Sequence, residues 1–399
     1  MASSSTLLFL DLPPGTFIGI DLLSFNSSPN FHGVIEVPIG IHFIYTGTDA
    51  SVSIRNGRWL NIESSSTTHT FQWNAEDESL SLITPDSPTA QHALSTMPSL
   101  PAHGLITYPA LEAATSNLQA GDTSTGAISP IPASSWTSLV SHISSSTIAR
   151  ITPTGTLTSI SSAPADSEAD SIPGLTRSEA LSALPSSTNL NLLPIDLKRT
   201  WAEGDVGVVR TERARDRSWY LHRLLGDLTE GYERHISARE VLGELQFCYV
   251  MVMVLANWSC LEGWKRIISV VFTCRIALRE AQGWFVEVVR VLKFQLERAE
   301  DVEGGVFELR EEGASGWLKV LLKRFRENVE DSLDPGSKLE QELQSLEEVM
   351  RERYGWEVEK TVLKRGMVQL EDGEMLEVSL TGADEDEEKG DWAPVVVET

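Results

Sequence analysis

The fold of the first part of the chain is decided by Ile41-His-Phe-Ile-Tyr-Thr46 and by three segments that follow it: Ser51-Val-Ser-Ile54, Asn56-Gly57 and Trp59-Leu-Asn-Ile62. Short runs rich in β-branched and aromatic residues, separated by turn residues, are typical of β-strands. An Asn-Gly pair between two such runs indicates a two-residue hairpin turn, because both central positions of that turn require positive φ. The sequence therefore predicts paired strands here, with a hairpin at Asn56-Gly57.

Four further runs of the same kind extend this prediction to a whole sheet. They lie at residues 17–21, 34–37, 70–73 and 79–83. Turns that contain proline or glycine separate them along the chain. We therefore expect a β-rich, sandwich-like N-terminal domain over residues 1–143, closed by a short helix around residues 136–143.

The composition changes at residues 144–190. Nineteen of these 47 residues are serine or threonine, and none is aromatic. Such a stretch buries too little apolar surface to offset the entropy lost on ordering, so we expect a disordered linker. The linker offers two candidate phosphorylation sites, Ser167 within Ser-Glu-Ala-Asp and Thr152 before a proline.

From residue 191 the apolar residues recur with a helical period. Ser237-Ala-Arg-Glu240 is a capping box in front of a strongly apolar run. Helices are expected at about residues 220–228, 237–256, 261–278, 281–298, 317–329 and 339–350. Several helices with short connections predict an all-α bundle or curved stack over residues 191–368. The fold class is thus α+β with two domains, followed by an acidic tail over residues 369–399.

The charge of the chain is strongly negative, with 57 acidic against 32 basic side chains and a net charge of −25. Residues 371–399 hold eleven acidic side chains and one lysine. Such a field repels phosphate, so we expect neither direct nucleic-acid binding nor attachment to anionic membranes. The longest apolar run, residues 247–256, is about half the length of a bilayer span, and residues 1–12 do not resemble a signal peptide. We therefore expect an intracellular soluble protein.

Motifs for catalysis or metal binding are missing from the sequence. There is no G-x-x-x-x-G-K-[ST], G-x-G-x-x-G or G-x-S-x-G, and no two histidines are spaced i, i+4. Cys248, Cys260 and Cys274 form no C-x-x-C pair and are interpreted as core cysteines. These patterns predict no metal, no cofactor and no enzyme. An enzyme using His42 and Asp21 is kept as the weakest alternative, because a structural histidine on a strand is the more common case.

The acidic tail ends in Pro394, Val395, Val396 and Val397. A β-branched run on a flexible tether suits β-strand addition, in which main-chain hydrogen bonds give affinity and alternate side chains give register. Pro394 would limit the length of such a strand. From the residues alone, a frayed terminus or a strand that folds back on its own domain is the more common case.

Several blocks of the sequence together resemble the A1-alpha2 repression splicing factor (Aar-two) family, in its filamentous-fungal form. The N-terminal blocks are Leu12-Pro-Pro-Gly-Thr-Phe-Ile-Gly-Ile-Asp21, Phe31-His-Gly-Val34, Pro38-Ile-Gly-Ile-His-Phe43 and Gly57-Arg-Trp-Leu60. The later blocks are Leu197-Lys-Arg-Thr-Trp201, Asp216-Arg-Ser-Trp-Tyr-Leu221, Val241-Leu-Gly-Glu-Leu-Gln-Phe247 with Asn257, Trp264-Lys-Arg-Ile-Ile268 and the terminal Ala393-Pro-Val-Val-Val-Glu398. They cover roughly residues 10–85, 190–300 and the end of the tail, in the family's order.

The resemblance implies a non-enzymatic assembly factor of the U5 small nuclear ribonucleoprotein (snRNP), with a VHS-like helical domain. It implies binding to the RNase H-like and MPN (Jab-type) domains of the large spliceosomal scaffold protein, with the tail valines Val395–Val397 pairing as a strand. It further implies that the factor keeps the U5 helicase and RNA off the scaffold until maturation, that phosphorylation favours release, and that the protein is a monomer of the cytoplasm and nucleus. The linker and the acidic run match no family motif, so no regulatory serine is assigned. The alternative is a generic helical adaptor with an autoinhibitory tail and partners outside splicing.

Overall fold

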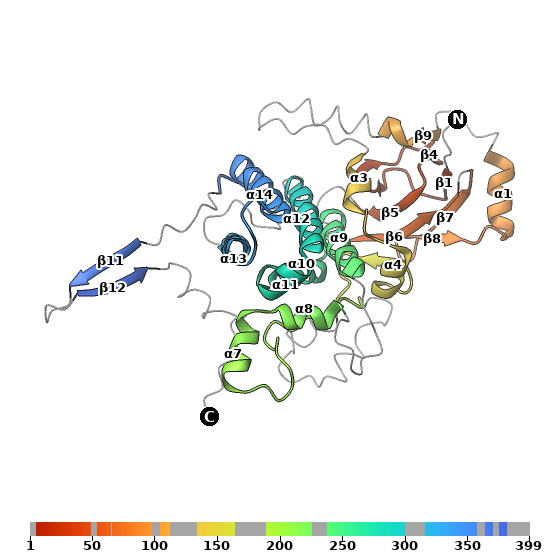
Figure 1. Cartoon of the computed structure of the whole chain (residues 1–399). Helices are drawn as coiled ribbons and strands as arrows, with labels where there is room; N and C mark the ends of the chain where they lie inside the picture. The colour runs from red at the N-terminus through yellow and green to blue at the C-terminus, as the bar shows by residue number, and fades with distance from the viewer. Residues whose placement is uncertain are drawn as a thin grey trace. The chain divides into compact units, whose positions relative to one another are not determined.

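The computed structural model describes residues 5–48, 54–64, 66–97, 104–111, 134–163, 189–225, 238–299, 316–356, 364–369 and 375–380 (Figure 1). The chain divides into two compact units. The β-rich unit comprises Met1–Leu193 and Leu242–Gly263, and the helical unit comprises Pro194–Val241 and Trp264–Thr399. The predicted two-part α+β architecture is confirmed.

Two five-stranded sheets build the β-rich unit. The first has the order β8-β7-β1-β4-β9, formed by β8 (Ser79–Ile83), β7 (Thr68–Asn74), β1 (Ser5–Leu10), β4 (Gly33–Val37) and β9 (Leu105–Thr107). The second has the order β10-β6-β5-β2-β3, formed by β10 (Thr156–Thr158), β6 (Arg55–Ile62), β5 (Gly40–Gly47), β2 (Phe17–Ile20) and β3 (Leu23–Asn26). The second sheet is antiparallel throughout, whereas β1–β7 and β4–β9 are parallel pairs in the first.

Apolar side chains from both sheets form one core, which makes the unit a sandwich. The buried members are Leu7, Phe9, Ile18, Ile20, Leu23, Phe31, Val34, Val37, Ile44, Leu60, Ile62, Phe71, Tyr108 and Leu111. Phe9 lies at the centre of an aromatic group, with its ring centroid 5.5 Å from those of Phe31 and Phe71. Helix α1 (Pro88–Thr96) follows β8 and begins at a Ser87 cap.

The hairpin predicted at Asn56-Gly57 is wrong. Both residues lie inside strand β6, where Asn56 pairs with Thr46 and Gly57 with Tyr45 of strand β5. A Cβ atom at Gly57 would lie 2.2 Å from Cζ of Phe43. The glycine is therefore needed for the close approach of an aromatic ring and not for a turn. Of the strand expected at residues 51–54, the first three residues lie outside the described part of the chain.

The disordered linker predicted over residues 144–190 is also wrong for its first twenty residues. Helix α4 (Ser145–Ile151) begins at Ser144, whose Oγ accepts a hydrogen bond from the Thr147 backbone N at 3.1 Å. Strand β10 then pairs antiparallel with β6. The serines that suggested a linker act partly as helix caps, and the sparse apolar residues, such as Ile148 and Ile151, are buried. Residues 164–188 lie outside the described part.

The predicted boundary at residue 191 differs from the structure in one respect. Helix α9 (Ala238–Leu255) was expected in the helical domain, yet from Leu242 onward it belongs to the β-rich unit. Phe247 of α9 stacks on Trp59 of β6 at 5.4 Å, and Trp136 of α3 (Ser134–Leu139) stacks on the same indole at 6.3 Å. The second sheet is therefore covered on its outer face as well, which explains why α9 is apolar on all sides.

Beyond α9, seven helices lie wholly or partly within the described residues of the helical unit. They are α7 (Gly207–Arg215), α8 (Ser218–Leu225), the later part of α10 (Trp258–Phe272), α11 (Ile276–Glu280), α12 (Gln282–Leu296), α13 (Gly316–Ser332) and α14 (Lys338–Tyr354), α11 being a single turn. The ring of Phe272 stacks on that of Phe325 at 4.4 Å. Trp264 Nε1 donates to Gln295 Oε1 at 2.9 Å, so the buried indole is satisfied.

A hairpin follows α14, at the place where the end of an all-α domain at residue 368 and the start of the acidic tail at residue 369 were expected. Strand β11 (Lys364–Gln369) pairs antiparallel with β12 (Met375–Leu380), with Gln369 opposite Met375 (Figure 1). Leu376, Val378 and Leu380 alternate with Glu377 and Ser379, a strand pattern that the sequence analysis missed. Residues 381–399, including the terminal valines, lie outside the described part.

Candidate functional site

A buried hydrogen-bonded group surrounds His42 in the sandwich. His42 Nδ1 lies 2.7 Å from Asp21 Oδ2, and His42 Nε2 lies 2.9 Å from the Pro38 carbonyl oxygen. Tyr108 donates its hydroxyl hydrogen to Asp21 Oδ2 at 2.7 Å, and the Phe43 backbone N donates to Asp21 Oδ1 at 2.9 Å. Because a carboxylate and a carbonyl can only accept, both ring nitrogens donate, and the ring is an imidazolium.

Electrostatics supports this protonation state. Burial lowers the pKa of His42, but the Asp21 charge and the hydrogen bonds to Asp21 and Pro38 outweigh it and raise the pKa above 6.5. The His42 residue is only 2% exposed. A ring that is buried and has both nitrogens engaged cannot exchange protons with a substrate, so the group is an internal ion pair. The enzyme alternative built on His42 and Asp21 loses its geometric basis.

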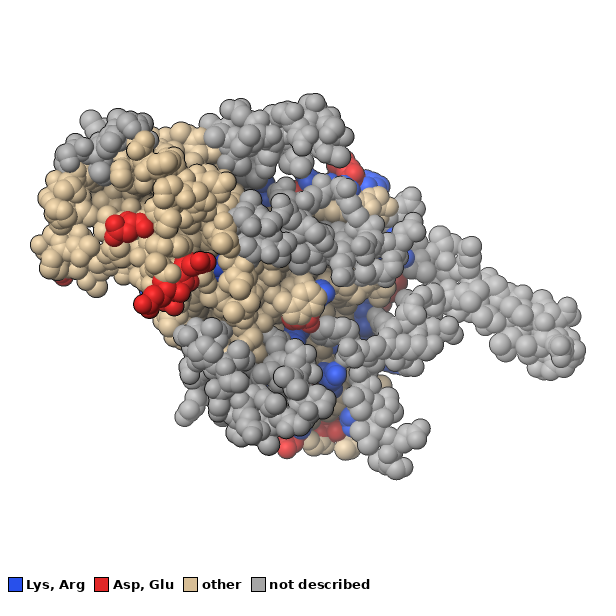
Figure 2. All heavy atoms as spheres, turned by 180° about the vertical axis from the view of Figure 1, so that it is seen from behind, with Lys and Arg blue, Asp and Glu red and all other residues tan. Residues whose placement is uncertain are grey.

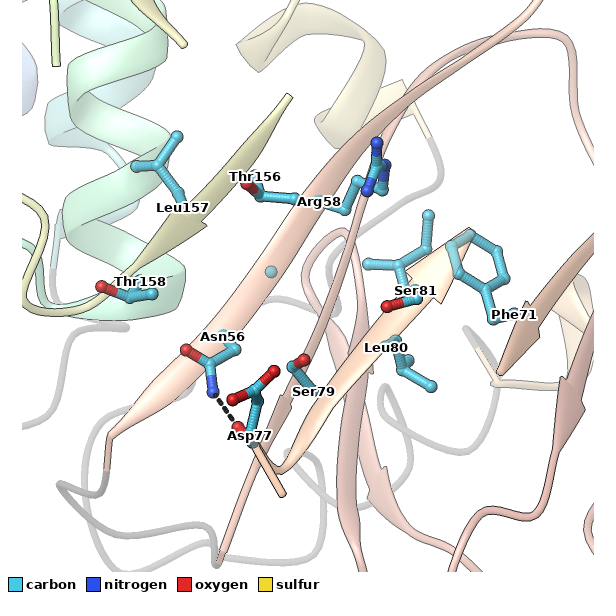
Figure 3. Close-up of a pocket in the computed structure, with 12 residues that line it drawn as sticks. Asn56, Arg58, Phe71, Asp77, Ser79, Leu80, Ser81, Thr156, Leu157 and Thr158 are labelled. Carbon is cyan, nitrogen blue, oxygen red and sulfur yellow. Dashed lines mark hydrogen bonds between the residues drawn. The ribbon is translucent and has the colours of Figure 1, made fainter. Parts of the chain in front are cut away.

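A hollow of about 240 Å³ lies where edge strand β8 approaches β6 and β10 (Figure 3). Its lining residues are Ile44, Asn56, Gly57, Arg58, Phe71, Asp77, Ser79, Leu80, Ser81, Thr156, Leu157 and Thr158. Arg58 Nη2 donates to the Thr154 carbonyl oxygen at 3.2 Å, and burial lowers the pKa of Arg58. Among the described lining residues there is no histidine, lysine or cysteine.

Three buried polar side chains fix α9 and the start of α10 within the β-rich unit. Glu244 Oε1 accepts from the Leu193 backbone N at 2.7 Å, and Glu244 Oε2 pairs with Arg150 at 2.8 Å. The Gln246 amide accepts from the His142 backbone N at 2.7 Å and donates to the Ser138 carbonyl oxygen at 3.0 Å.

Asn257 is the third of these side chains and is fully buried. Its Nδ2 donates to the carbonyl oxygens of Thr158 and Ser161, both at 3.0 Å. Its Oδ1 accepts from the Cys260 backbone N at 2.9 Å, which makes Asn257 the N-cap of α10. Glu244, Gln246 and Asn257, which all lie in the blocks that resemble the family, are therefore packing residues of the β-rich unit.

A different kind of surface surrounds α7 in the helical unit. Helix α7 contains no buried residue. Val206, Val208 and Val209 are 77%, 72% and 46% exposed. Exposed basic side chains accompany them, and we define the α7 surface by its exposed members Lys198, Arg199, Val206, Val208, Val209 and Arg215.

The segment before α7 is held against the helix by specific contacts. Thr200 Oγ1 donates to the Arg213 carbonyl oxygen at 3.2 Å, and Arg213 Nη1 pairs with Asp205 Oδ2 at 2.5 Å. The Arg210 guanidinium lies 4.3 Å from the centroid of the Trp201 ring. These contacts place Lys198 and Arg199 beside α7. The sequence analysis missed this surface, although Val206-Gly-Val-Val209 followed by arginines at 210, 213 and 215 could have indicated a helix without a core face.

The charge of this region contrasts with the rest of the molecule. Residues 198–223 hold seven basic and four acidic side chains, in a chain of net charge −25. Figure 2 shows a face on which uncharged side chains cover most of the β-rich unit, with a few acidic groups among them. The α7 surface is thus a local basic and apolar area in an acidic protein.

The site residues predicted from the sequence fall into two groups. Thr152 is 2% exposed, and its hydroxyl donates to the Thr156 carbonyl oxygen at 2.8 Å, so its prediction as a phosphorylation site is wrong for the folded chain. Ser167 and the strand residues Pro394, Val395, Val396 and Val397 lie outside the described residues, and their roles stay predictions.

The three cysteines are buried and free, as expected for core residues. Burial raises the pKa of the Cys248 and Cys274 thiols. Within the described ranges, no cluster of three or more histidine, cysteine, aspartate or glutamate side chains has the arrangement of a metal site. No helix there has both the length and the apolarity that a membrane span requires.

The fold and these sites define a two-unit protein in which a helix-covered β-sandwich is joined to a helical unit with an exposed basic and apolar surface. The AAR2 N-terminal domain profile matches residues 3–153, and the AAR2 C-terminal repeat region profile matches residues 192–359. Similar curated proteins are the AAR2 homologue of human, 25% identical over 318 residues, and that of mouse, 24% identical over 325 residues; each alignment covers 73% of this chain and 75% of the relative. The Caenorhabditis elegans AAR2 homologue is 23% identical over 378 residues, which is 88% of this chain and 94% of the relative.

The chain belongs to the AAR2 family. The family resemblance inferred from the sequence blocks is thereby confirmed. The filamentous-fungal subtype and the VHS-like character of the helical unit stay predictions.

Proposed function

We propose that this protein is a non-enzymatic pre-mRNA splicing factor that assists assembly of the U5 snRNP. The observation that carries the proposal is the match of AAR2 profiles to both parts of the chain, 3–153 and 192–359. In this role it binds the RNase H-like and MPN domains of the large scaffold protein and keeps the U5 helicase and RNA off them until maturation. It acts as a monomer in the cytoplasm and nucleus, without a cofactor.

The charge distribution supports a scaffold-binding role. Surfaces that later bind RNA are expected to be basic, and a partner of net charge −25 is attracted to them. A protein that occupies such a surface excludes RNA from it. We therefore expect binding to weaken when salt rises from about 50 to about 500 mM, because screening shortens the range of these interactions.

Strand addition by the tail is the second part of the proposal. Val395, Val396 and Val397 follow an acidic tether, which raises their local concentration near a partner already bound through the folded units. Main-chain pairing requires the backbone N–H of the strand, so a proline within the valine run should be more harmful than an alanine. Phosphorylation is proposed as a signal for release, with Ser167 as a candidate site and no regulatory serine assigned.

Calorimetric titration of the scaffold C-terminal fragment tests both parts. The full chain should bind tightly, and truncation to residues 1–389 should weaken binding by about tenfold or more, about 1.4 kcal/mol. Val396→Pro should reproduce most of that loss, whereas Val396→Ala should lose little. Absence of binding by the full chain would refute the scaffold role. Equal binding by the full chain and the truncation would refute strand addition and assign the interface to the folded units.

A further inference from the structure

The α7 surface is apolar and basic, and the proposed scaffold role assigns no function to it. Its valines are among the most exposed large apolar side chains of the described residues. Three adjacent apolar side chains at this exposure are more typical of an interaction site than of a solvated helix. Exposed Glu203 and Glu212 lie nearby, but Asp205 is neutralised by Arg213 and Asp216 accepts hydrogen bonds from the Ser218 and Arg275 backbone N atoms.

The N-terminus of α7 also favours the binding of a negatively charged group. Val206, its N-cap residue, makes no side-chain cap hydrogen bond, and the first turn contains no acidic residue. The first backbone N–H groups of a helix and its dipole attract carboxylates. Lys198 and Arg199, which the Thr200–Arg213 contact holds near the last turn of α7, and Arg215 at the end of the helix add positive charge to the same surface.

The C-terminal tail of the same chain has the complementary composition. Residues 381–399 carry seven acidic side chains and one lysine, with five consecutive acids at 384–388. Trp392 and the valine run follow after Lys389, Gly390 and Asp391. An acidic block beside an apolar block fits a surface on which exposed cations border exposed valines.

The tail is long enough to reach this surface. Because Lys364 lies opposite Leu380 in the β11–β12 hairpin, the reach from Trp356 to Asp384 comes from residues 356–364 and 380–384, and twelve extended residues span at most about 41 Å. A folded unit of this size is about 40 Å across. Tethering also raises the effective concentration of the tail at the surface, so weak contacts suffice.

We propose that the acidic tail, residues 381–399, docks on the α7 surface in the free protein. The acids at 384–388 lie against the cations and the N-terminus of α7, and the apolar residues that follow cover Val206, Val208 and Val209. The docking itself is independent of the scaffold. The consequence that a docked tail must be released before its valines can pair with a scaffold rests on the proposed function.

Carbodiimide cross-linking of the full-length chain tests the docking without any partner. The reagent joins a carboxylate directly to an amine in contact with it, and Lys198 is the lysine of the α7 surface. Mass spectrometry of the monomeric fraction should find Lys198 joined to residues 384–388, in preference to Lys265 or Lys338. Most of this cross-link should be lost at about 1 M salt, where the screening length falls to about 3 Å.

Two variants separate docking from chance encounter. Val206→Thr combined with Val208→Thr should lower the Lys198 yield several-fold, whereas Ile276→Thr, an exposed apolar residue of the same unit, should leave it unchanged. Both changes lie on exposed side chains, so the fold should be retained. The proposal is overturned if Lys198 and Lys338 react with the tail equally, if the valine changes have no effect, or if Lys198 is joined to the acids at 300–312 in place of the tail.

Discussion

Replacement of Asn257 by alanine should destabilise the β-rich unit strongly. The side chain is fully buried, donates to the carbonyl oxygens of Thr158 and Ser161, and caps α10 through the Cys260 backbone N. Loss of an N-cap costs about 1 kcal/mol, and each buried carbonyl left without its donor costs about 1 kcal/mol more. The expected loss is therefore about 3 kcal/mol, which lowers the melting temperature of a unit of this size by about 6–12 °C.

Differential scanning calorimetry is the suitable assay because the two units can unfold in separate transitions. Asn257→Ser keeps an oxygen that can cap α10 but removes the amide donors, so it should lose about 2 kcal/mol. Asn26→Ala is the matched control, since Asn26 is an exposed asparagine of the same unit and should change stability by less than about 0.5 kcal/mol. A loss below about 0.5 kcal/mol for Asn257→Ala would refute the assignment of these hydrogen bonds.

The other predictions concern the buried ion pair, the excluded phosphorylation site and two glycines. The pKa of His42 is raised above 6.5, so the stability that the charged ring contributes is complete below pH 6.5 and is lost as the pH rises through the folded-state pKa. Urea unfolding from about pH 5.5 to 8.5 should show this decline in the free energy of unfolding. The variant His42→Gln should not show the decline. Thr152→Asp buries an unpaired charge and should lower the melting temperature by several degrees, whereas Thr154→Asp, at an exposed position, should not. Gly57→Ala forces a Cβ into an aromatic ring and should destabilise by about 1–3 kcal/mol. Gly283→Ala, at an open helix position, should stabilise by about 0.5 kcal/mol in chemical denaturation, and a loss there would contradict the helix-propensity argument.

The sequence predicts the strands and helices that have a clear apolar period, and it fails where tertiary contacts decide the role of a residue. The run at 41–46 lies in strand β5 as expected, because the strand preference of β-branched and aromatic residues is a local property. Gly57 was misassigned because a glycine that admits a neighbouring ring carries the same local signal as one in a turn. Ser144 lies in a stretch with the composition of a linker. Its hydroxyl nevertheless caps helix α4, whose apolar residues are buried through contacts distant in the sequence.

The site residues also divide into those with a local sequence signal and those whose role depends on tertiary contacts. Cysteine burial could be predicted, because each cysteine lies in an apolar helical context. The partners of His42 could not be predicted from spacing, because Asp21, Pro38 and Tyr108 converge only through sheet pairing. The α7 surface has a local signal, valines at 206, 208 and 209 followed by arginines, but only the three-dimensional structure shows that no other described element covers those valines.

The placement of Glu244, Gln246 and Asn257 bears on where a partner can bind. These residues belong to the block that resembles the family most specifically, yet each is buried and engaged with backbone groups of the β-rich unit. A buried side chain that satisfies the main chain specifies the fold and cannot contact a partner directly. Similarity in that block therefore supports a shared architecture, whereas recognition must depend on exposed groups. The α7 surface provides such groups, and the tail acids are complementary to it in charge. Cross-linking in the free chain and titration with the scaffold fragment examine these two surfaces separately.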